Sequence, residues 1–583
     1  MNGLHHRGAL AAVTAALLAT GAARAQGEAP LAEPTGVEAR AWDHFVDYAG
    51  LVKLMEAMRD RWPEWITLEP IGKSVQGRTL WVMTVTDRSK GAPETKPAMY
   101  VDGNIHGNEV QGSEAALYTA WYLCRFAPQV VRLRRILEAR TLYVVPCMNP
   151  DGRDSWFHDA HTAHSSRGGQ EPTDNDGDGL YDEDGPNDLD GDGNITRMRK
   201  RVPLGQGTFR LDPKDPRNML RVEEGEQGDW ILLGQEGGDD DGDGRVDEDG
   251  PGGYDPNRDF GSDWQPGWIQ YGARTRPFAL PESRAVRDFL LSRPNVAGVQ
   301  AFHNSGGMIL RGPGSEHVAF EARDLPVYDA LGRKGEELLP FYRYMTVWKD
   351  LYTVHGGFVD WTYLGLGVLS FTNEMWTGKR RTQGTRELGR DEALEWDHDH
   401  AFDAHFVPWK PYDHPVYGAV EIGGPVKYTG RVPPGFLIPE MLHRNAAFVL
   451  YQCDELPELE LERTDVRPAG AGLAYVDVVI RNLRLTPTRT AQAAARHIGR
   501  PDLLLCEPEG VEVLAAGRVR DRFRPEATVP LPERQRPTRI PIEEGVGSRG
   551  RLSIRYLVRG QGTLRFRYEA EKAKDLAFEL PLR

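Results

Sequence analysis

The sequence predicts an α/β fold, with a mixed, mostly parallel central sheet flanked by helices, followed by a C-terminal all-β sandwich. Short apolar segments alternate with segments of helical spacing in the first part of the chain. Alternating strand-like runs dominate after about residue 457. The 583 residues also exceed the roughly 250–300 over which one core usually grows. We therefore expect an α/β domain over 38–458 and a sandwich over 459–583.

The N-terminal elements of the α/β domain can be placed by periodicity. Apolar residues have helical spacing over 41–60, and residues 66–87 alternate like a hairpin. A strand over 99–102, a helix over about 109–126 and a strand over 141–146 follow in order. Such alternation is typical of a sheet that helices bury on both faces.

Two later apolar runs, 296–302 and 367–371, look like central strands. Each delivers a polar residue at its C-terminal end, His303 in the first case and Glu374 in the second. Ligands of open α/β sheets collect at the carboxyl ends of the strands. We therefore expect these two side chains at a functional edge of the sheet.

The stretch 154–256 is rich in Gly, Asp and Pro and interrupts the α/β pattern as an insertion. It contains three D-x-D-x-D-G segments, in which alternate carboxylates can converge on a hard cation. Their aspartates are Asp174, Asp176 and Asp178, then Asp188, Asp190 and Asp192, then Asp239, Asp241 and Asp243. The twelfth-position Glu of an EF-hand is absent, with Gly185, Arg199 and Gly250 there instead. The segments resemble dockerin or thrombospondin calcium loops, and we expect structural calcium rather than a plain solvated loop.

The C-terminal sandwich is predicted from alternating runs at 474–480, 552–558 and 563–568. A short Ala-rich stretch near 491–496 is the exception with helical character. The four cysteines, Cys124, Cys147, Cys453 and Cys506, have no C-x-x-C spacing, which argues against a thiolate metal site. A Cys124–Cys147 disulfide and two free thiols both remain open.

Residues 1–25 have the pattern of a cleaved signal peptide. His5, His6 and Arg7 precede an apolar run over 8–18, and Ala23-Arg24-Ala25 fits a small-x-small cleavage site. No later stretch reaches the roughly 18 apolar residues of a membrane helix. We expect a secreted or periplasmic protein cleaved near Ala25, without membrane insertion.

Four residues could carry the chemistry, although each alone is weak evidence. His106 and Glu109 lie three apart at a predicted strand-to-helix turn, so both can reach one cation. An H-x-x-E string is common by chance, and a surface pair is the simpler interpretation unless a third ligand exists. His303 alone suggests a hydrogen-bonded loop residue, and Glu374 alone could form a structural salt bridge.

Taken together, the motifs resemble those of the zinc carboxypeptidase A-like family over residues 38–455, apart from the insertion. They occur in family order: IGKSVQGR (71–78), HGNE (106–109), NPDG (149–152), NRDF (257–260), FHNSGG (302–307), YTVHGGFVDW (352–361), SFTNE (370–374) and EIGG (421–424). The resemblance implies zinc held by His106, Glu109 and His303, with Glu374 as general base. Against the family pattern, Asn108 stands where an arginine is common, so a subsite contact is in doubt.

The resemblance also implies roles in substrate binding. Asn257 and Arg258 would clasp the terminal carboxylate, Tyr352 would cover it, and Val359 would line the specificity pocket and disfavour basic C-terminal residues. Arg199 is the closest match for the arginine that stabilises the oxyanion, with Arg197 as the fallback because the insertion loosens the alignment.

The expected function is that of a secreted zinc metallocarboxypeptidase that cleaves the C-terminal peptide bond through a zinc-activated water. The partner is then a peptide or protein with a free C-terminal carboxylate, and nothing indicates nucleic acid. A zinc amidase or cell-wall peptide carboxypeptidase is an alternative. A non-catalytic calcium-dependent binding protein on the same scaffold is another.

Overall fold

The computed structural model describes residues 35–159, 167–169, 172, 174, 177–247, 254–378, 390–427, 431–521, 523–524, 527–532 and 534–583. The predicted signal segment 1–25 and Asp176 lie outside these residues. Residues 41–583 form one compact unit, and the described part of the preceding unit contains the 3-10 helix η1 (Gly36–Ala39).

An eight-stranded sheet forms the centre of the α/β part. Its strands, in the order in which they pair, are β1 (Ile66–Lys73), β2 (Thr79–Val85), β4 (Thr141–Val145), β3 (Ala98–Gly103), β9 (Val296–Asn304), β12 (Leu369–Met375), β10 (Met308–Arg311) and β11 (Arg343–Thr346). The pairs β4–β3, β3–β9, β9–β12 and β10–β11 are parallel, and the other three are antiparallel. The prediction of a mixed, mostly parallel sheet is therefore confirmed.

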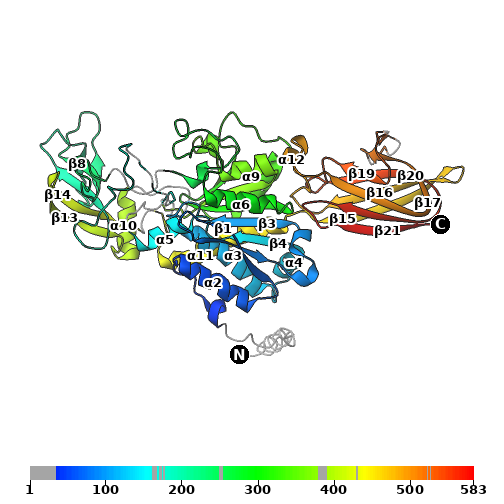
Figure 1. The fold of residues 1–583 in the computed structure, drawn as a ribbon, viewed down its shortest axis with the longest axis horizontal. Coiled ribbons are helices and arrows are strands. Elements are labelled where there is room, and N and C mark those ends of the chain that lie inside the picture. Colours follow the sequence, from blue (N-terminus) through cyan, green and yellow to red (C-terminus); the bar gives the residue numbers. More distant parts are fainter. Residues whose placement is uncertain are drawn as a thin grey trace, which may run out of the picture. The chain divides into compact units, whose positions relative to one another are not determined.

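The central strands are buried along nearly their whole length because helices cover both faces of the sheet. Figure 1 shows α6 and α9 on one side of the sheet and α3 and α4 on the other. On the first side, Tyr100 of β3 packs against Phe289 of α6 and Phe358 of α9. The main helices are α2 (Tyr48–Arg61), α3 (Gln111–Phe126), α4 (Val131–Ala139), α5 (Pro150–His158), α6 (Pro281–Leu291), α7 (Leu325–Leu338), α8 (Val347–Asp350), α9 (Phe358–Leu366), α10 (Arg390–Ala401) and α11 (Ile438–Asp454).

A second, six-stranded sheet, which the sequence patterns did not predict, combines four strands of the insertion with two strands from residues 406–425. Its strands in pairing order are β13 (Phe406–His414), β14 (Gly418–Pro425), β5 (Arg197–Arg201), β8 (Trp230–Gln235), β6 (Phe209–Leu211) and β7 (Met219–Arg221). Met198, Val420 and Ile422 form its small buried core. The EIGG segment at 421–424 belongs to β14 and pairs with β5, so it lies in this sheet rather than in the central one.

The C-terminal part is built on two long strands, each of which contributes to two layers of sheet. These are β17 (Asp502–Val519) and β20 (Arg551–Glu569), which pair with a register shift near Gly510, whose φ of 71° favours glycine. The remaining strands are β15 (Leu459–Gly470), β16 (Leu473–Asn482), β18 (Thr528–Pro530), β19 (Arg539–Ile542) and β21 (Leu576–Leu582). The predicted strands at 552–558 and 563–568 are thus the two halves of one strand.

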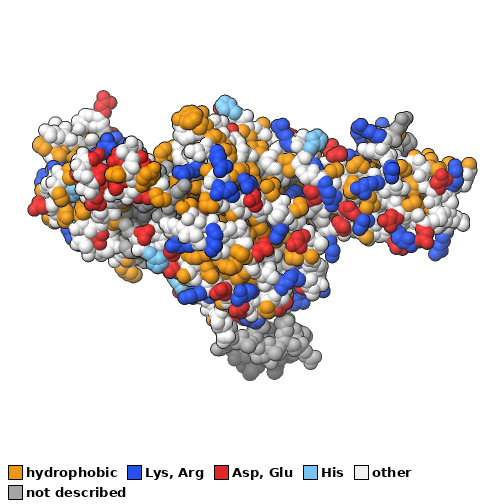
Figure 2. Space-filling model, in the orientation of Figure 1, with side chains coloured by type: hydrophobic (Ala, Val, Ile, Leu, Met, Phe, Trp, Pro, Cys, Tyr) orange, Lys and Arg blue, Asp and Glu red, His pale blue; other side chains and the backbone are white. Residues whose placement is uncertain are grey.

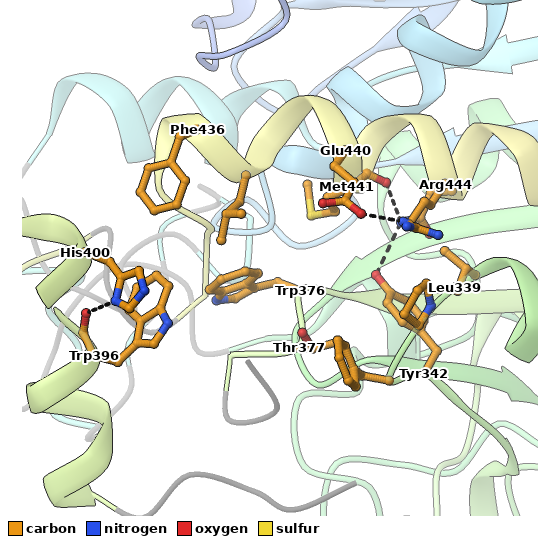
Figure 3. A pocket seen from close by; sticks show the side chains of 14 residues that line it. Leu339, Tyr342, Trp376, Thr377, Trp396, His400, Phe436, Glu440, Met441 and Arg444 are labelled. Atoms are coloured by element: carbon orange, nitrogen blue, oxygen red, sulfur yellow. Dashed lines mark hydrogen bonds and ion pairs between the residues drawn. The ribbon is translucent and has the colours of Figure 1, made fainter. Parts of the chain in front are cut away.

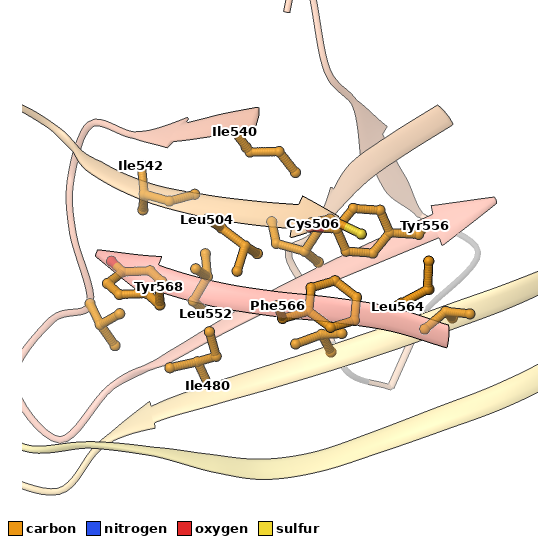
Figure 4. Packing of buried hydrophobic residues seen from close by; sticks show 14 of the residues in the cluster. Ile480, Leu504, Cys506, Ile540, Ile542, Leu552, Tyr556, Leu564, Phe566 and Tyr568 are labelled. Atoms are coloured by element: carbon orange, nitrogen blue, oxygen red, sulfur yellow. The ribbon is translucent and has the colours of Figure 1, made fainter. Parts of the chain in front are cut away.

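A single hydrophobic core fills the space between the layers of this β domain. Figure 4 shows Leu504 and Cys506 of β17 and Phe566 of β20 pointing into it, together with Ile480 of β16. Side chains from both halves of the long strands share this core, as a sandwich requires. The predicted Ala-rich helix is α12 (Ala491–Ala495), whose first backbone amides donate to the Asp324 carboxylate.

All four cysteines are buried free thiols, which resolves the open disulfide question in favour of free thiols in this structure. Burial raises the pKa of Cys147 to about 12, so this thiol is held in its unreactive neutral form. Among the described residues, no helix has both the length and the apolar character needed to cross a bilayer.

Candidate active site

The predicted metal ligands meet at the carboxyl edge of the central sheet. His106 follows β3, Glu109 precedes α3, and His303 lies near the end of β9, the strand next to β3. A close approach of β3 and α3 makes the turn between them tight, since a Cβ at Gly103 would lie 2.4 Å from the carbonyl carbon of Gly112. Glycine at both positions therefore allows His106 and Glu109 to face the same point.

The three side chains form one compact buried cluster. His106 Nδ1 lies 2.9 Å from Glu109 Oε1, and His303 Nδ1 lies 2.9 Å from Glu109 Oε2. One ligand atom from each residue lies within 4.8 Å of the others, and all three residues are at most 3% exposed. Two imidazole nitrogens and one carboxylate are a donor set that zinc accepts, with a coordination position left open. The residues thus fit the predicted zinc site.

Asp255 orients the first of these imidazoles. Its Oδ1 lies 2.9 Å from His106 Nε2. Burial raises the pKa of Asp255, but His106, Arg258 and Arg167 outweigh burial and hold that pKa well below its usual range. Because an ionised carboxylate only accepts, Nε2 must donate, which leaves the Nδ1 lone pair of a neutral His106 available to a cation. Sequence reasoning missed this residue, although it stands two positions before the NRDF motif.

Glu374 stands beside the cluster on the neighbouring strand. In the parallel pairing of β12 with β9 it is the register partner of His303. Burial, and then the negative charge of Glu109, raise its pKa to about 7. The positive charges of His303, Arg167 and Arg431 lower this pKa, but the two raising effects outweigh them. A carboxyl group with a pKa near neutrality can accept and return a proton.

Arg167 is a site residue that sequence reasoning missed. Its guanidinium lies 3.0 Å from Glu109 Oε1 and 3.4 Å from Asp255 Oδ2. A second cation, Arg431, lies 3.6 Å from Glu109 Oε1 and donates to the backbone oxygen of Asn304. The sequence held one usable cue for Arg167, its place between the NPDG and NRDF motifs, before the acidic loops begin.

The structure places Arg199 away from this cluster, which corrects the choice of Arg199 as the oxyanion arginine. Arg199 lies on β5 and forms a 2.7 Å ion pair with Glu421. Its guanidinium lies 4.7 Å from the ring centroid of Trp230 and 4.1 Å from that of Trp409. Arg197, the fallback, is exposed at the start of the same strand. Both arginines therefore belong to the second sheet.

The residues predicted to hold a terminal carboxylate lie next to Asp255. Asn257 Oδ1 accepts a hydrogen bond from the Phe358 amide, so its Nδ2 group remains the available donor. Arg258 is 7% exposed, donates to the Asn257 backbone oxygen, and has a buried Nε without a hydrogen-bond partner among the described residues. An Arg258 side chain held in this way presents a planar donor group for a carboxylate.

The two other residues predicted to contact the substrate, Tyr352 and Val359, differ in burial. Tyr352 is 52% exposed, so its ring lies at the surface. Val359, on α9, packs against the core cluster between the helices and the sheet. Asn108, which stands where the family commonly has an arginine, is buried, with 1% of its surface exposed.

An apolar pocket of about 330 Å³ opens beside the end of β12. Figure 3 shows Trp376 in its middle, with Trp396 and Phe436 on one side and Leu339 and Tyr342 on the other. The backbone oxygen of Trp376 accepts a hydrogen bond from the Gly306 amide, so the pocket wall contacts the turn after β9. None of the predicted zinc ligands lines this pocket.

The acidic loops form separate carboxylate clusters in the insertion. Carboxylate oxygens of Asp188, Asp190 and Asp192 lie within 4.8 Å of one another, as do those of two further groups. Figure 2 shows acidic side chains gathered at the upper left, over the region where Figure 1 labels β8. The further groups are Asp239, Asp241 and Asp243, and Asp178, Glu183 and Asp241; Asp174 caps its own turn by accepting from Gly177 and Gly179.

The chain is similar in sequence to curated carboxypeptidases. Carboxypeptidase N catalytic chain of Rattus norvegicus is 34% identical over 106 residues, which is 18% of this chain and 23% of that protein. Carboxypeptidase Z of Homo sapiens is 35% identical over 106 residues, 18% of this chain and 16% of that protein. The chain thus covers less than a quarter of the length of these curated relatives.

Two solved structures are similar at low identity. Bovine thrombin-activatable fibrinolysis inhibitor in complex with tick carboxypeptidase inhibitor has a TM-score of 0.42 and 16% identity, over 71% of this chain and 97% of that chain. Carboxypeptidase A from Helicoverpa armigera has a TM-score of 0.41 and 15% identity, over 72% of this chain and 77% of that chain.

Family profiles divide the chain into two matched parts. A domain of unknown function matches residues 458–580. This range includes β15 to β20 in full and the first part of β21. The zinc carboxypeptidase profile matches residues 51–185 and 230–389, about half of the chain, and includes the four site residues His106, Glu109, His303 and Glu374. By this match the chain belongs to the zinc carboxypeptidase family.

Proposed function

We propose that the protein is a secreted zinc metallocarboxypeptidase that hydrolyses the C-terminal peptide bond of peptides or proteins. The observation that carries the proposal is the buried cluster of His106, Glu109 and His303, with ligand atoms within 4.8 Å of one another and Glu374 in register with His303. Zinc held by these three residues would supply a Lewis acid that activates water and polarises a peptide carbonyl.

The residues of the chain divide the work of the reaction. Glu374, with a pKa raised to about 7, takes a proton from the attacking water and passes it to the leaving amine. Arg167, rather than Arg199, stabilises the negative charge that develops on the carbonyl oxygen, because it reaches the edge where Glu109 lies. Asp255 keeps His106 oriented through the 2.9 Å contact with Nε2.

The exopeptidase character rests on recognition of a free carboxylate. Arg258 and the Nδ2 group of Asn257 bind the terminal carboxylate, and Tyr352 covers it. Val359 contributes an apolar wall to the specificity pocket, which favours uncharged C-terminal side chains. The N-terminal signal pattern supports export of the protein.

Two alternatives keep the same scaffold. A cell-wall peptide carboxypeptidase or zinc amidase would use the same zinc cluster on a different substrate, and muropeptides tested beside blocked dipeptides distinguish these activities. A non-catalytic calcium-dependent binding protein would not need Glu374 beside three potential ligands. The acidic loops support a structural calcium requirement in each case, because so many carboxylates repel one another without a cation.

The proposal is tested by metal content and hydrolysis in wild type and in Glu374→Gln. We expect near-stoichiometric zinc in both proteins and turnover of blocked dipeptides only in wild type, since Glu374 is assigned proton transfer and not coordination. Dipeptides with an amidated C-terminus serve as the matched substrate control and should not be cleaved. Full activity of Glu374→Gln, or absence of zinc from wild type, would overturn the proposal.

A further inference from the structure

The loop of Asp188, Asp190 and Asp192 lacks the acidic residue that normally completes a calcium loop. Arg199 occupies the twelfth position, and it is used in the ion pair with Glu421. Three carboxylates on a short loop are common without any ion, so the loop by itself does not define a site. Calcium takes six to eight oxygen ligands, so further oxygens must come from elsewhere.

Glu236 closes this loop from a distant part of the chain. It directly follows β8, and its backbone oxygen accepts from the Asn187 amide at 3.2 Å. Its backbone amide donates to the Thr196 oxygen at 3.2 Å. Asn187 and Thr196 bracket the three aspartates, so Glu236 lies at the neck where the loop begins and ends.

One carboxylate oxygen of Glu236 is left without a donor. Oε1 accepts from the Thr196 amide at 2.8 Å, whereas Oε2 is buried and has no hydrogen-bond partner among the described residues. The residue is 0% exposed. An unpaired buried carboxylate oxygen is costly, and burial followed by the charges of Asp190, Asp188 and Asp192 raises the pKa of Glu236 to about 7.

Lys410, a cation beside the loop, does not neutralise the Glu236 carboxylate. Lys410 Nζ lies 3.7 Å from Asp190 Oδ2 and 3.8 Å from Asp192 Oδ2, but its side chain is 53% exposed. It reaches two of the loop carboxylates and makes no ion pair with Glu236. The Glu236 carboxylate lies outside the 4.8 Å group of the three aspartates, so ligation requires its side chain to turn toward them. A divalent cation bound there would then satisfy both the repulsion and the unpaired oxygen.

We propose that Glu236 is the fourth carboxylate ligand of a calcium site formed with Asp188, Asp190 and Asp192. This inference rests on the proposed calcium loops and names the residue that completes one of them. Glu236 takes the part that a twelfth-position glutamate has in a contiguous loop, but it comes from a neighbouring strand. The ion therefore joins the loop to the ends of β5 and β8.

The site is coupled to the stability of the second sheet. Leu189, between two of the aspartates, packs against the core of Met198, Val420 and Ile422. Calcium that fixes the loop also fixes this side chain in the core, so binding should raise the unfolding temperature of the sheet.

The test uses the full chain, depleted of calcium and with zinc content measured in each sample. Calcium titration calorimetry at pH 8 compares wild type with Glu236→Gln, which keeps the acceptor for the Thr196 amide. The matched control is Glu224→Gln, an exposed glutamate of the same insertion. We expect Glu236→Gln to lose one calcium or to bind it at least ten-fold more weakly, and Glu224→Gln to match wild type.

Thermal unfolding gives a second readout that a merely structural role would not produce. Without calcium, Glu236→Gln should unfold at a higher temperature than wild type, because it removes a buried charge from an acidic cluster. With saturating calcium the order should reverse. A variant that is destabilised equally in both conditions would overturn the inference.

Two further variants separate the possible failures. Asp190→Asn should lose the same calcium, and its combination with Glu236→Gln should cause little additional loss, whereas Asp239→Asn should affect a different one. Equal calcium binding by wild type and Glu236→Gln refutes the role of Glu236 alone. Absence of calcium binding by wild type refutes the calcium loops as well, while the zinc and hydrolysis measurements remain a separate test.

Discussion

Replacing Arg167 with glutamine should lower kcat on blocked dipeptides by about 10²–10³-fold. The estimate follows from the cost of removing one donor to a developing oxyanion, roughly 2.7–4 kcal/mol. Arg167 is the suitable donor because its guanidinium lies 3.0 Å from Glu109 Oε1 and 3.4 Å from Asp255 Oδ2. KM should change less than kcat, since the terminal carboxylate is assigned to Arg258.

The same substitution should move the pH profile. The charge of Arg167 lowers the pKa of Glu374, which burial and Glu109 raise to about 7. Removing that charge raises the Glu374 pKa further, so the acid limb of kcat/KM should shift to higher pH. The shift and the loss of kcat are measured on the same enzyme preparations, with zinc content as a check on the metal site.

Arg199→Gln is the matched control for this prediction. It removes the 2.7 Å ion pair with Glu421 and the stacking on Trp230 and Trp409, so it should lower the unfolding temperature. Folded Arg199→Gln should keep kcat within about two-fold of wild type, because these contacts lie in the second sheet. A kcat loss in Arg199→Gln equal to or larger than that in Arg167→Gln would refute the reasoning.

Three further changes probe other parts of the structure. Asp255→Asn should weaken zinc binding about 10–100-fold in a chelator competition, because it removes the negative charge that fixes His106 Nε2 as the donor. Asp263→Asn, which loses contacts outside the zinc cluster, should not weaken it, and equal losses would contradict this role. Burial raises the pKa of Asp360 from 3.8 to about 7, so its protonated form is favoured in the folded chain and stability is lost as pH rises through this range. Asp360→Asn should therefore gain up to about 4 kcal/mol over wild type in urea unfolding at pH 8 and little at pH 4, and a pH-independent difference would count against it. Glu114→Gln should lower the free energy of unfolding by about 3 kcal/mol, because it leaves the fully buried Arg153 cation without its anionic partner; an unchanged urea midpoint would show that neutral acceptors suffice.

The sequence predicted the central sheet well because its strands are short apolar runs with sharp ends. The run 296–302 became Val296–Asn304, and 141–146 became Thr141–Val145. The second sheet was missed because β6 and β7 have three residues each, β5 has Met198 as its buried apolar residue, and β13 and β14 come from a distant part of the chain. Hydrophobic periodicity carries little information for such strands.

The candidate site likewise contains residues that could be predicted from the sequence and residues that could not. His106, Glu109, His303 and Glu374 stand in short motifs at strand ends, so their convergence could be predicted. Arg167 has no such motif, and its position depends on how the chain folds back around the insertion. The unpaired oxygen of Glu236 could not be predicted either, because it depends on the pairing of β8 with β5.

The ion pair between Arg167 and Asp255 has a consequence for how the protein could change in evolution. The chain departs from the catalytic edge at Arg167 and returns to it at Asp255, whose carboxylate lies 3.4 Å from the Arg167 guanidinium. The length of chain between these two points costs little, since the entropy of closing a loop grows only slowly with its size. Because β14 pairs with β5, the β13–β14 hairpin belongs to the same module. Replacing residues 170–253 and this hairpin each with a short flexible bridge should therefore preserve the catalytic geometry, and other modules could be exchanged at these points without rebuilding the enzyme.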